Sequence, residues 1–111
     1  MKLSQIKGDR CFEVIADVIE PISVIASDKT VMEMLRPKKT PEGMQPKEFF
    51  IKRMKEGLPV LLRDHKGEFV AIMAAINGVD KKDYLKNLNL ARLFSDVMDM
   101  LNDEELLAFL S

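Results

Sequence analysis

The sequence has few of the residues that build metal sites, disulfides and stacking surfaces. Its 111 residues include one cysteine, Cys11, one histidine, His65, one tyrosine and no tryptophan. A single cysteine cannot form an internal disulfide, and one cysteine with one histidine cannot make an ordinary zinc site. Aromatic surface for stacking on bases or sugars is also scarce. We therefore expect a reduced chain with no metal and no cofactor.

Charge of one sign and long hydrophobic runs are absent as well. Seventeen Lys and Arg face 18 Asp and Glu, so no overall field draws the chain onto nucleic acid or an anionic membrane. No run approaches the roughly 20 apolar residues of a membrane span, and MKLSQIKGDR lacks the apolar core of a signal peptide. We expect a soluble cytoplasmic protein without a nucleic-acid or membrane partner.

The residues that are present repeat with helical spacing. In DRCFEVIADVIE the charges are three and four apart, and apolar residues fill the rest, which predicts a helix packed on more than one side. Asp9 can cap this helix, and Pro21 is expected to kink or end it. Ser27 or Asp28 then begins a short helix that stops before Pro37. The charged positions are Arg10, Glu13, Asp17 and Glu20.

Three prolines and a glycine mark residues 36–46, RPKKTPEGMQP, as an exposed loop. The residues before it are too few for a core of their own, so we expect one domain over residues 1–111. Pro46 suits the first position of the next helix. Pro59 predicts a kink near Gly57 or a second helix that begins at Leu58.

The stretch GLPVLLRDHKGEFVAIMAAING, residues 57–78, has two possible structures. PVLL and FVAIM around a polar turn resemble a β-hairpin. However, the runs do not alternate with polar residues, AIMAAI favours a helix, and no third strand is available. Gly67 and Gly78 each suit a helix C-terminus. We predict helices here.

The last third contains three further helix starts, at Asp80, at Asn89 and at Asn102 or Asp103. Between Asn89 and Asn102, apolar residues follow the i, i+3, i+4, i+7 pattern of a core-facing helix. The predicted fold is all-α, a single compact domain of five to seven short helices.

No constellation of residues indicates catalysis. Neighbouring helical residues point about 100° apart, so Asp64 and His65 cannot orient each other as an acid–base pair. We expect His65 to be a surface or capping histidine. No phosphate loop, nucleophile elbow or cluster of metal ligands is present. We predict a protein that is not an enzyme and has no catalytic residues.

Two kinds of binding protein are left. The basic clusters RPKK, KRMK and Lys81-Lys82 allow a small helical DNA-binding regulator of a phage or mobile element, but acidic residues interleave and the isoelectric point is near 5.8. The ending MDMLNDEELLAFLS carries more large apolar residues than one packed helix face needs, which indicates a partner's helix or self-association as readily as a core contact. The candidate partner-binding residues are Met98, Leu101, Leu106, Leu107, Phe109 and Leu110.

The arrangement of these segments resembles a known family. RCFEVIADVIEPI, PVLLRDHK and LARLFSDVMDMLNDEELLAFL are similar to segments of the small tail assembly chaperones of long-tailed, siphovirus-type bacteriophages and prophages of Gram-positive bacteria. The resemblance extends over nearly the whole chain.

This resemblance implies an all-α, non-catalytic chaperone in the cytoplasm of the bacterial host, absent from the mature virion. Such proteins bind the tape measure protein, keep it soluble and associate reversibly with copies of themselves. A longer form made by frameshifting recruits tail tube protein in many members, and a chain that ends at Ser111 would be the short form. The eight methionines fit an adaptable contact surface.

Overall fold

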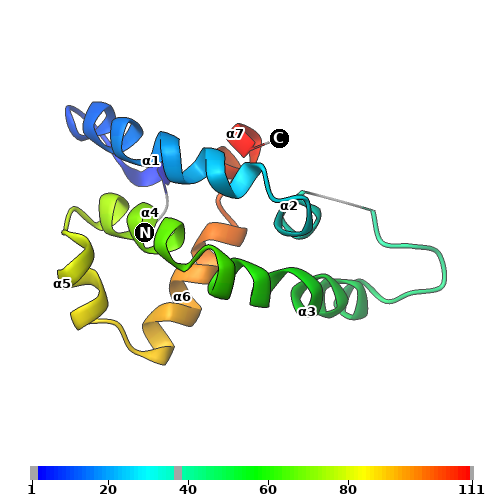
Figure 1. The fold of residues 1–111 in the computed structure, drawn as a ribbon. Coiled ribbons are helices and arrows are strands. Elements are labelled where there is room, and N and C mark those ends of the chain that lie inside the picture. Colours follow the sequence, from blue (N-terminus) through cyan, green and yellow to red (C-terminus); the bar gives the residue numbers. More distant parts are fainter. Residues whose placement is uncertain (1–2, 37–38, 111) are drawn as a thin grey trace.

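The described part of the chain, residues 3–36 and 39–110 of a computed structural model, contains helices and no strand. This confirms the all-α prediction, and residues 57–78 form the end of one helix and the whole of the next. The elements, drawn in Figure 1, are η1 (Leu3–Gln5), α1 (Arg10–Ala26), α2 (Lys29–Leu35), α3 (Pro46–Asp64), α4 (Lys66–Asn77), α5 (Lys81–Lys86), α6 (Leu90–Leu101) and α7 (Glu104–Leu110).

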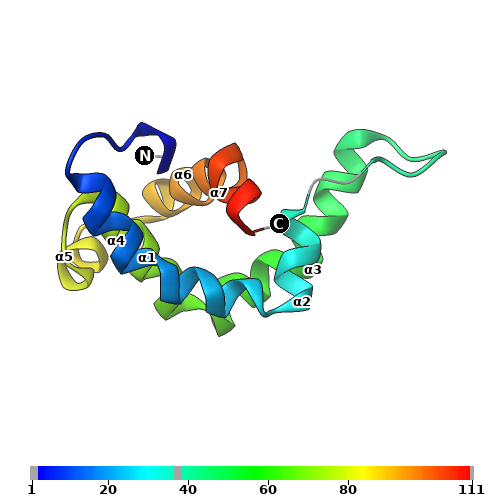
Figure 2. The same cartoon turned by 90° about the horizontal axis from the view of Figure 1, so that it is seen from above.

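The helices pack as two main pairs around one core. α1 lies along α4, and α2 lies against α3, while α7 contacts α1, α6 and η1. Seen from above in Figure 2, α7 and the N-terminal segment lie on the same side of α1. The most deeply buried large apolar side chains come from five helices: Val18, Val31, Leu61, Ile72, Met73, Ile76 and Leu106.

α1 packs on one face only, which differs from the prediction of burial on more than one side. The side chains of Val14, Val18, Ile22 and Ile25 are buried in the core. A second apolar row along the same helix stays in contact with solvent: Phe12 is 79% exposed, Ile15 51% and Ile19 46%. The apolar face of α1 predicted from the sequence is therefore wider than the face that neighbouring helices bury.

Prolines inside two helices end neither of them. α1 continues through Pro21 and α3 through Pro59, so two of the predicted alternatives, a helix end at Pro21 and a second helix from Leu58, do not occur. A proline removes one intrahelical hydrogen bond and leaves the carbonyl four residues earlier without its N–H donor. These carbonyls belong to Asp17 and Lys55, which are both exposed residues.

Helix caps follow the sequence with two exceptions. The carboxylate of Asp28 accepts hydrogen bonds from the backbone of Thr30 and Val31, and Gly78 ends α4 with φ of 70°. Asp9 precedes α1 but its side chain makes no capping hydrogen bond. Gly67 lies in the first turn of α4, not after a helix end. The remaining side-chain caps are those of Asp80, Asn89 and Asp103.

Gly57 allows α2 to approach α3 closely. A Cβ atom at this position would lie 2.5 Å from Cβ of Met34, which is too near for any rotamer change to relieve. We expect Gly57→Ala to destabilise the fold, because overpacking costs about 1–3 kcal/mol and outweighs the roughly 1 kcal/mol gained in helix propensity. Urea unfolding followed by far-UV circular dichroism measures the change.

Gly67→Ala is the matched control for this substitution. A Cβ at Gly67 meets nothing within 4 Å, and the residue is also helical. The same exchange is expected here to stabilise the protein by up to about 1 kcal/mol. Equal effects at Gly57 and Gly67 would show that α2 and α3 are not in close contact.

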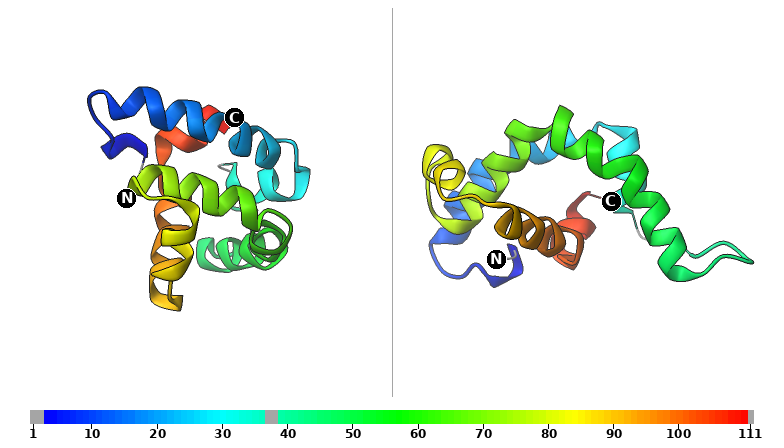
Figure 3. Two further views of the ribbon diagram at one scale, coloured as in Figure 1. Left: turned by 60° about the vertical axis from the view of Figure 1, so that its left-hand side comes forward. Right: turned by 90° about the horizontal axis from the view of Figure 1, so that it is seen from below.

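The fold has one long extension. The principal extents are 47 × 26 × 23 Å, and the radius of gyration of 14.3 Å exceeds the roughly 13 Å expected for a compact chain of this length. The excess comes from the first half of α3 and the loop before it, which project past α2 in Figure 1 and in the view from below in Figure 3. We call residues 39–55 the arm.

Candidate protein-binding surfaces

The structure separates the C-terminal residues that the sequence grouped together. Leu106 is only 1% exposed and belongs to the core. Leu101 and Leu107 are partly buried and pack against that core, and Met98 is also partly exposed. Phe109 is 54% exposed, whereas the side chain of Leu110 lies outside the described part of the chain. The predicted set is therefore divided between core and surface.

A row of apolar side chains on α6 begins with two strongly exposed residues. Leu90 is 84% exposed and Phe94 70%. With their helical spacing, Met98 and Leu101 continue the same side of the helix. We call Leu90, Phe94, Met98 and Leu101 the α6 stripe. The sequence pattern placed Leu90 and Phe94 on a core-facing side, but the structure exposes both.

The buried side of α6 includes a carboxylate. Asp96 is 2% exposed, and its Oδ2 accepts a hydrogen bond of 2.5 Å from the Tyr84 hydroxyl. Arg92 Nε donates to the same oxygen at 3.2 Å. Burial, together with the Asp96 carboxylate, raises the pKa of Tyr84. Asp96, Val97 and Met100 are the buried residues of α6, and the stripe lies on another side of the helix.

A second apolar surface lies between α1, α7 and the N-terminal segment. We call it the α1–α7 groove, and its volume is about 260 Å³. Exposed Ile15 and Ile19 lie on one wall, Phe109 lies on the other, and Glu105 is the only charged residue of the lining. The remaining lining residues are Leu3, Ile6, Cys11, Val14, Val18 and Ile22. The sequence predicted Phe109 as a contact residue but assigned Ile15 and Ile19 to buried positions.

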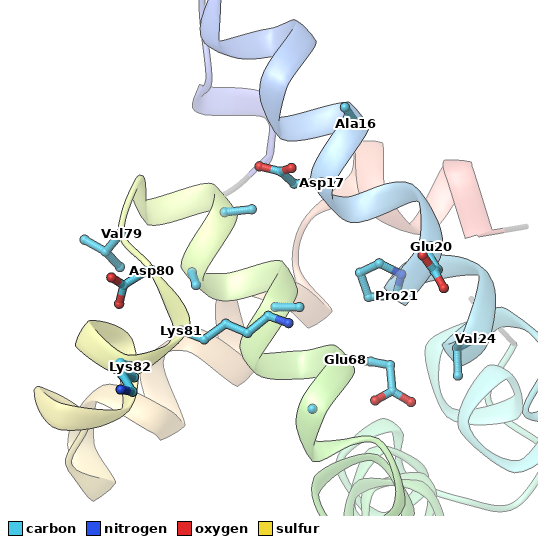
Figure 4. A pocket seen from close by; sticks show the side chains of 14 residues that line it. Ala16, Asp17, Glu20, Pro21, Val24, Glu68, Val79, Asp80, Lys81 and Lys82 are labelled. Carbon is cyan, nitrogen blue, oxygen red and sulfur yellow. The ribbon is translucent and has the colours of Figure 1, made fainter.

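A wider, shallower groove runs between α1, α4 and the start of α5. Its volume is about 1100 Å³, and small side chains such as Ala71 and Ala75 form its floor. Figure 4 shows Asp17 and Glu20 along α1 and the side chain of Lys81 lying across α4. Most of its lining is exposed, so this groove is an open surface and not an enclosed ligand site.

His65 is buried at the corner between α3 and α4, where it is the C-cap residue of α3, so it takes the capping position predicted as one alternative and not the surface position. Its Nε2 lies 2.6 Å from Oδ2 of Asp28, and its Nδ1 lies 3.2 Å from Oε1 of Glu68. Burial alone would lower the pKa of His65, but the hydrogen bonds to both carboxylates outweigh it and raise the pKa. The partner is Asp28 and not the neighbouring Asp64. Both ring nitrogens are engaged, so the cluster joins the α3–α4 corner to the start of α2.

The described residues show neither a metal site nor a membrane span. No group of three or more His, Cys, Asp or Glu in residues 3–36 and 39–110 is placed to hold a metal ion. In the same ranges, no helix is both long and apolar enough to cross a bilayer. Comparison of the chain with protein-family models, with curated proteins and with solved structures gives no match.

Proposed function

We propose that this protein is a tail assembly chaperone of a long-tailed bacteriophage or prophage. It would bind the tape measure protein in the cytoplasm of the bacterial host, keep it soluble and leave before the virion is complete. The proposal combines the sequence resemblance with an all-α fold whose surface carries large apolar side chains. The tail tube protein, recruited through a longer frameshifted form, and further copies of the chain would be its other partners.

The α6 stripe is the observation that carries the proposal. The stripe begins with a leucine that is 84% exposed and a phenylalanine that is 70% exposed one helical turn apart, so this 12.7 kDa protein leaves both large side chains largely uncovered by its own fold. Contiguous exposed apolar surface of this kind marks protein–protein contact sites. A long helical partner can pack on such a row through an apolar face of its own, with contact residues spaced three and four apart. Met98 adds an adaptable side chain within the stripe.

Co-expression with an adjacent long, helix-rich tape measure gene, if the source genome has one, tests the proposal. We expect a soluble complex that co-purifies, with the tape measure protein insoluble when it is made alone. Leu90→Ser with Phe94→Ser should abolish this solubilisation while far-UV circular dichroism stays helical, because neither side chain is part of the core. A tape measure protein that is equally insoluble with and without this chain would reject the proposal.

Val79→Ser with Leu85→Ser is the matched control. These residues are 43% and 45% exposed, and both lie outside the α6 stripe. These substitutions reduce the exposed apolar area of the protein but leave the α6 stripe intact. Solubilisation of the tape measure protein should survive in this variant, so a loss here would mean that the contact is not specific to α6.

A small helical DNA-binding regulator is the alternative, and the arm is the observation that favours it. Residues 39–55 carry five Lys and Arg and two Glu. Phosphate contacts from such a segment would shift random duplex DNA at low salt and lose affinity steeply as salt rises. Lys47→Glu with Lys52→Glu should then abolish the shift. An absence of any shift at about 50 mM salt removes this alternative.

A further inference from the structure

The α1–α7 groove is an apolar surface between acidic elements. Its exposed apolar side chains, Ile15, Ile19 and Phe109, are joined at the start of α1 by Phe12, which is 79% exposed. The two segments that form its walls, residues 3–26 and 104–109, contain six carboxylates and two basic residues. One of the two, Arg10, is engaged elsewhere, because its Nη2 donates to the carbonyl oxygen of Ile76 at 2.9 Å.

The carboxylates lie on both sides of the apolar row. On α1, Glu13 and Glu20 each follow an exposed apolar residue directly and so point about 100° away from it, along the edge of the row. On α7, Glu105 lines the groove one helical turn before Phe109. A segment that fills this groove is therefore expected to be apolar in the middle and basic at its margins.

The arm of the same protein has this chemistry. Phe50 and Ile51 are 43% and 41% exposed on the first half of α3, beyond the end of α2. Exposed Lys47 and Lys52 lie within four residues of both, and exposed Lys55 lies four residues after Ile51. Arg53 is used inside the protein, because its guanidinium donates to backbone carbonyls at the end of α2, those of Met34 and Arg36. The lysines therefore supply the charge that the arm offers to a partner.

We propose that the arm of one copy docks in the α1–α7 groove of a second copy. Phe50 and Ile51 cover the apolar row of α1 and Phe109, and the lysines of the arm lie against the carboxylates of α1 and α7. The arm projects from the body at one end in Figures 1 and 2, so it is sterically available to a neighbouring molecule. The proposal does not depend on the identity of any other partner of the protein.

This contact is heterologous, because the two copies contribute different surfaces. Each molecule that docks its arm still presents an empty groove, and the molecule that receives the arm still presents its own arm. Association of this type continues into rings or open arrays instead of stopping at a symmetric dimer. The near balance of 17 basic and 18 acidic residues hides this separation of charge between arm and groove.

Sedimentation velocity as a function of protein concentration and salt is the first test. We expect the weight-average mass to rise with concentration at low salt and to fall as salt is raised from about 0.05 M to about 1 M, because screening weakens exposed charge pairs. Ile19→Asn in the groove and Ile51→Asn on the arm should each weaken association at least about tenfold, since each removes an apolar contact from the centre of the interface. A wild-type protein that stays monomeric at every concentration overturns the proposal.

Mixing the two variants gives the decisive result. The Ile19→Asn protein keeps an intact arm and the Ile51→Asn protein keeps an intact groove, so an equimolar mixture should form a one-to-one pair that cannot grow further. A symmetric groove-to-groove contact predicts a different pattern, in which Ile51→Asn associates like the wild type. That pattern, or a mixture that stays monomeric, overturns the proposal.

Leu85→Asn is the matched control for both variants. Leu85 is 45% exposed on α5 and belongs to neither surface, so its replacement should leave self-association unchanged. Loss of self-association in this variant would show that the contact is not specific to the arm and the groove, and would overturn the proposal. Far-UV circular dichroism and the thermal midpoint of each variant show that the fold is kept. Tape measure binding is measured separately, so failure of one proposal is distinguishable from failure of the other.

Discussion

Replacing Leu106 by alanine is expected to lower the free energy of unfolding by about 2–5 kcal/mol, the usual cost of emptying a buried leucine site. Leu106 is 1% exposed and its side chain joins α7 to the core. Domains of this size have total stabilities of roughly 5–15 kcal/mol, so the variant should lose a large part of its stability. The midpoint of urea unfolding measures the change.

Phe109→Ala in the same helix provides the comparison. Phe109 is 54% exposed in the α1–α7 groove, so its loss should cost less than about 1 kcal/mol. The pair compares a core side chain of α7 with an exposed side chain of the same helix. A Phe109 variant that is less stable than the Leu106 variant would contradict this arrangement of the helix.

Replacing Asp28 by asparagine is expected to cost about 1.5–3 kcal/mol near pH 6, the typical value of a hydrogen bond that involves a charged group. Asparagine caps a helix as well as aspartate does, so the exchange preserves the start of α2 and removes the charge beside His65. The hydrogen bond to His65 is the main reason that the pKa of Asp28 lies below its ordinary value of 3.8.

The loss should depend on pH, with a direction that follows from the two shifted pKa values. The pKa of His65 is raised above its ordinary value of 6.5, so the stability from the protonated ring is present below pH 6.5 and disappears as the pH rises through the raised value. The stability from the Asp28 carboxylate is present above pH 3.8 and disappears as the pH falls through the lowered value. The difference in the free energy of unfolding between wild type and Asp28→Asn is therefore largest between pH 3.8 and pH 6.5.

Urea unfolding at pH 6 and at pH 9 measures this difference. The wild type should lose stability between the two values, and Asp28→Asn should lose less, because its His65 has one carboxylate neighbour in place of two. Asp64→Asn is the control, since Asp64 is next to His65 in the chain but has no hydrogen bond to the ring in the structure. If Asp28→Asn lowers the free energy of unfolding by the same amount at pH 6 and at pH 9, the His65 ring is not protonated in the folded protein.

Local signals predicted the helices well, because each is marked by a few adjacent residues. Asp28, Asp80 and Asn89 cap the helices that follow them, and Gly78 ends α4 with a positive φ. The prolines were misleading for a physical reason. A proline removes one N–H donor and crowds the carbonyl four residues earlier, but tertiary context can keep the helix continuous, and that context cannot be read from local sequence.

The exposed apolar surfaces of α1 and α6 were harder to predict. An apolar helix face in the sequence shows which residues are suited to burial, but it does not show whether another element covers them. Ile15 and Ile19 have the spacing of a packed face, but α4 covers only the adjacent row of α1. Leu90 and Phe94 have the same spacing, but buried Asp96 takes the core-facing side of α6. The partner of His65, Asp28, is 37 residues away in the chain, so no local pattern indicated it.

The hydrogen bond between Leu3 and Asp103 has a consequence for the order in which the protein is made. The backbone N–H of Leu3 donates to Oδ2 of Asp103 at 2.7 Å, and Oδ1 of the same carboxylate accepts from the N–H of Leu106. Synthesis proceeds from the N-terminus, and domains generally fold as units. Here the first described turn meets its partners only after Asp103 and α7 have been made. The nascent chain therefore exposes this side of α1 until α7 is available to cover it.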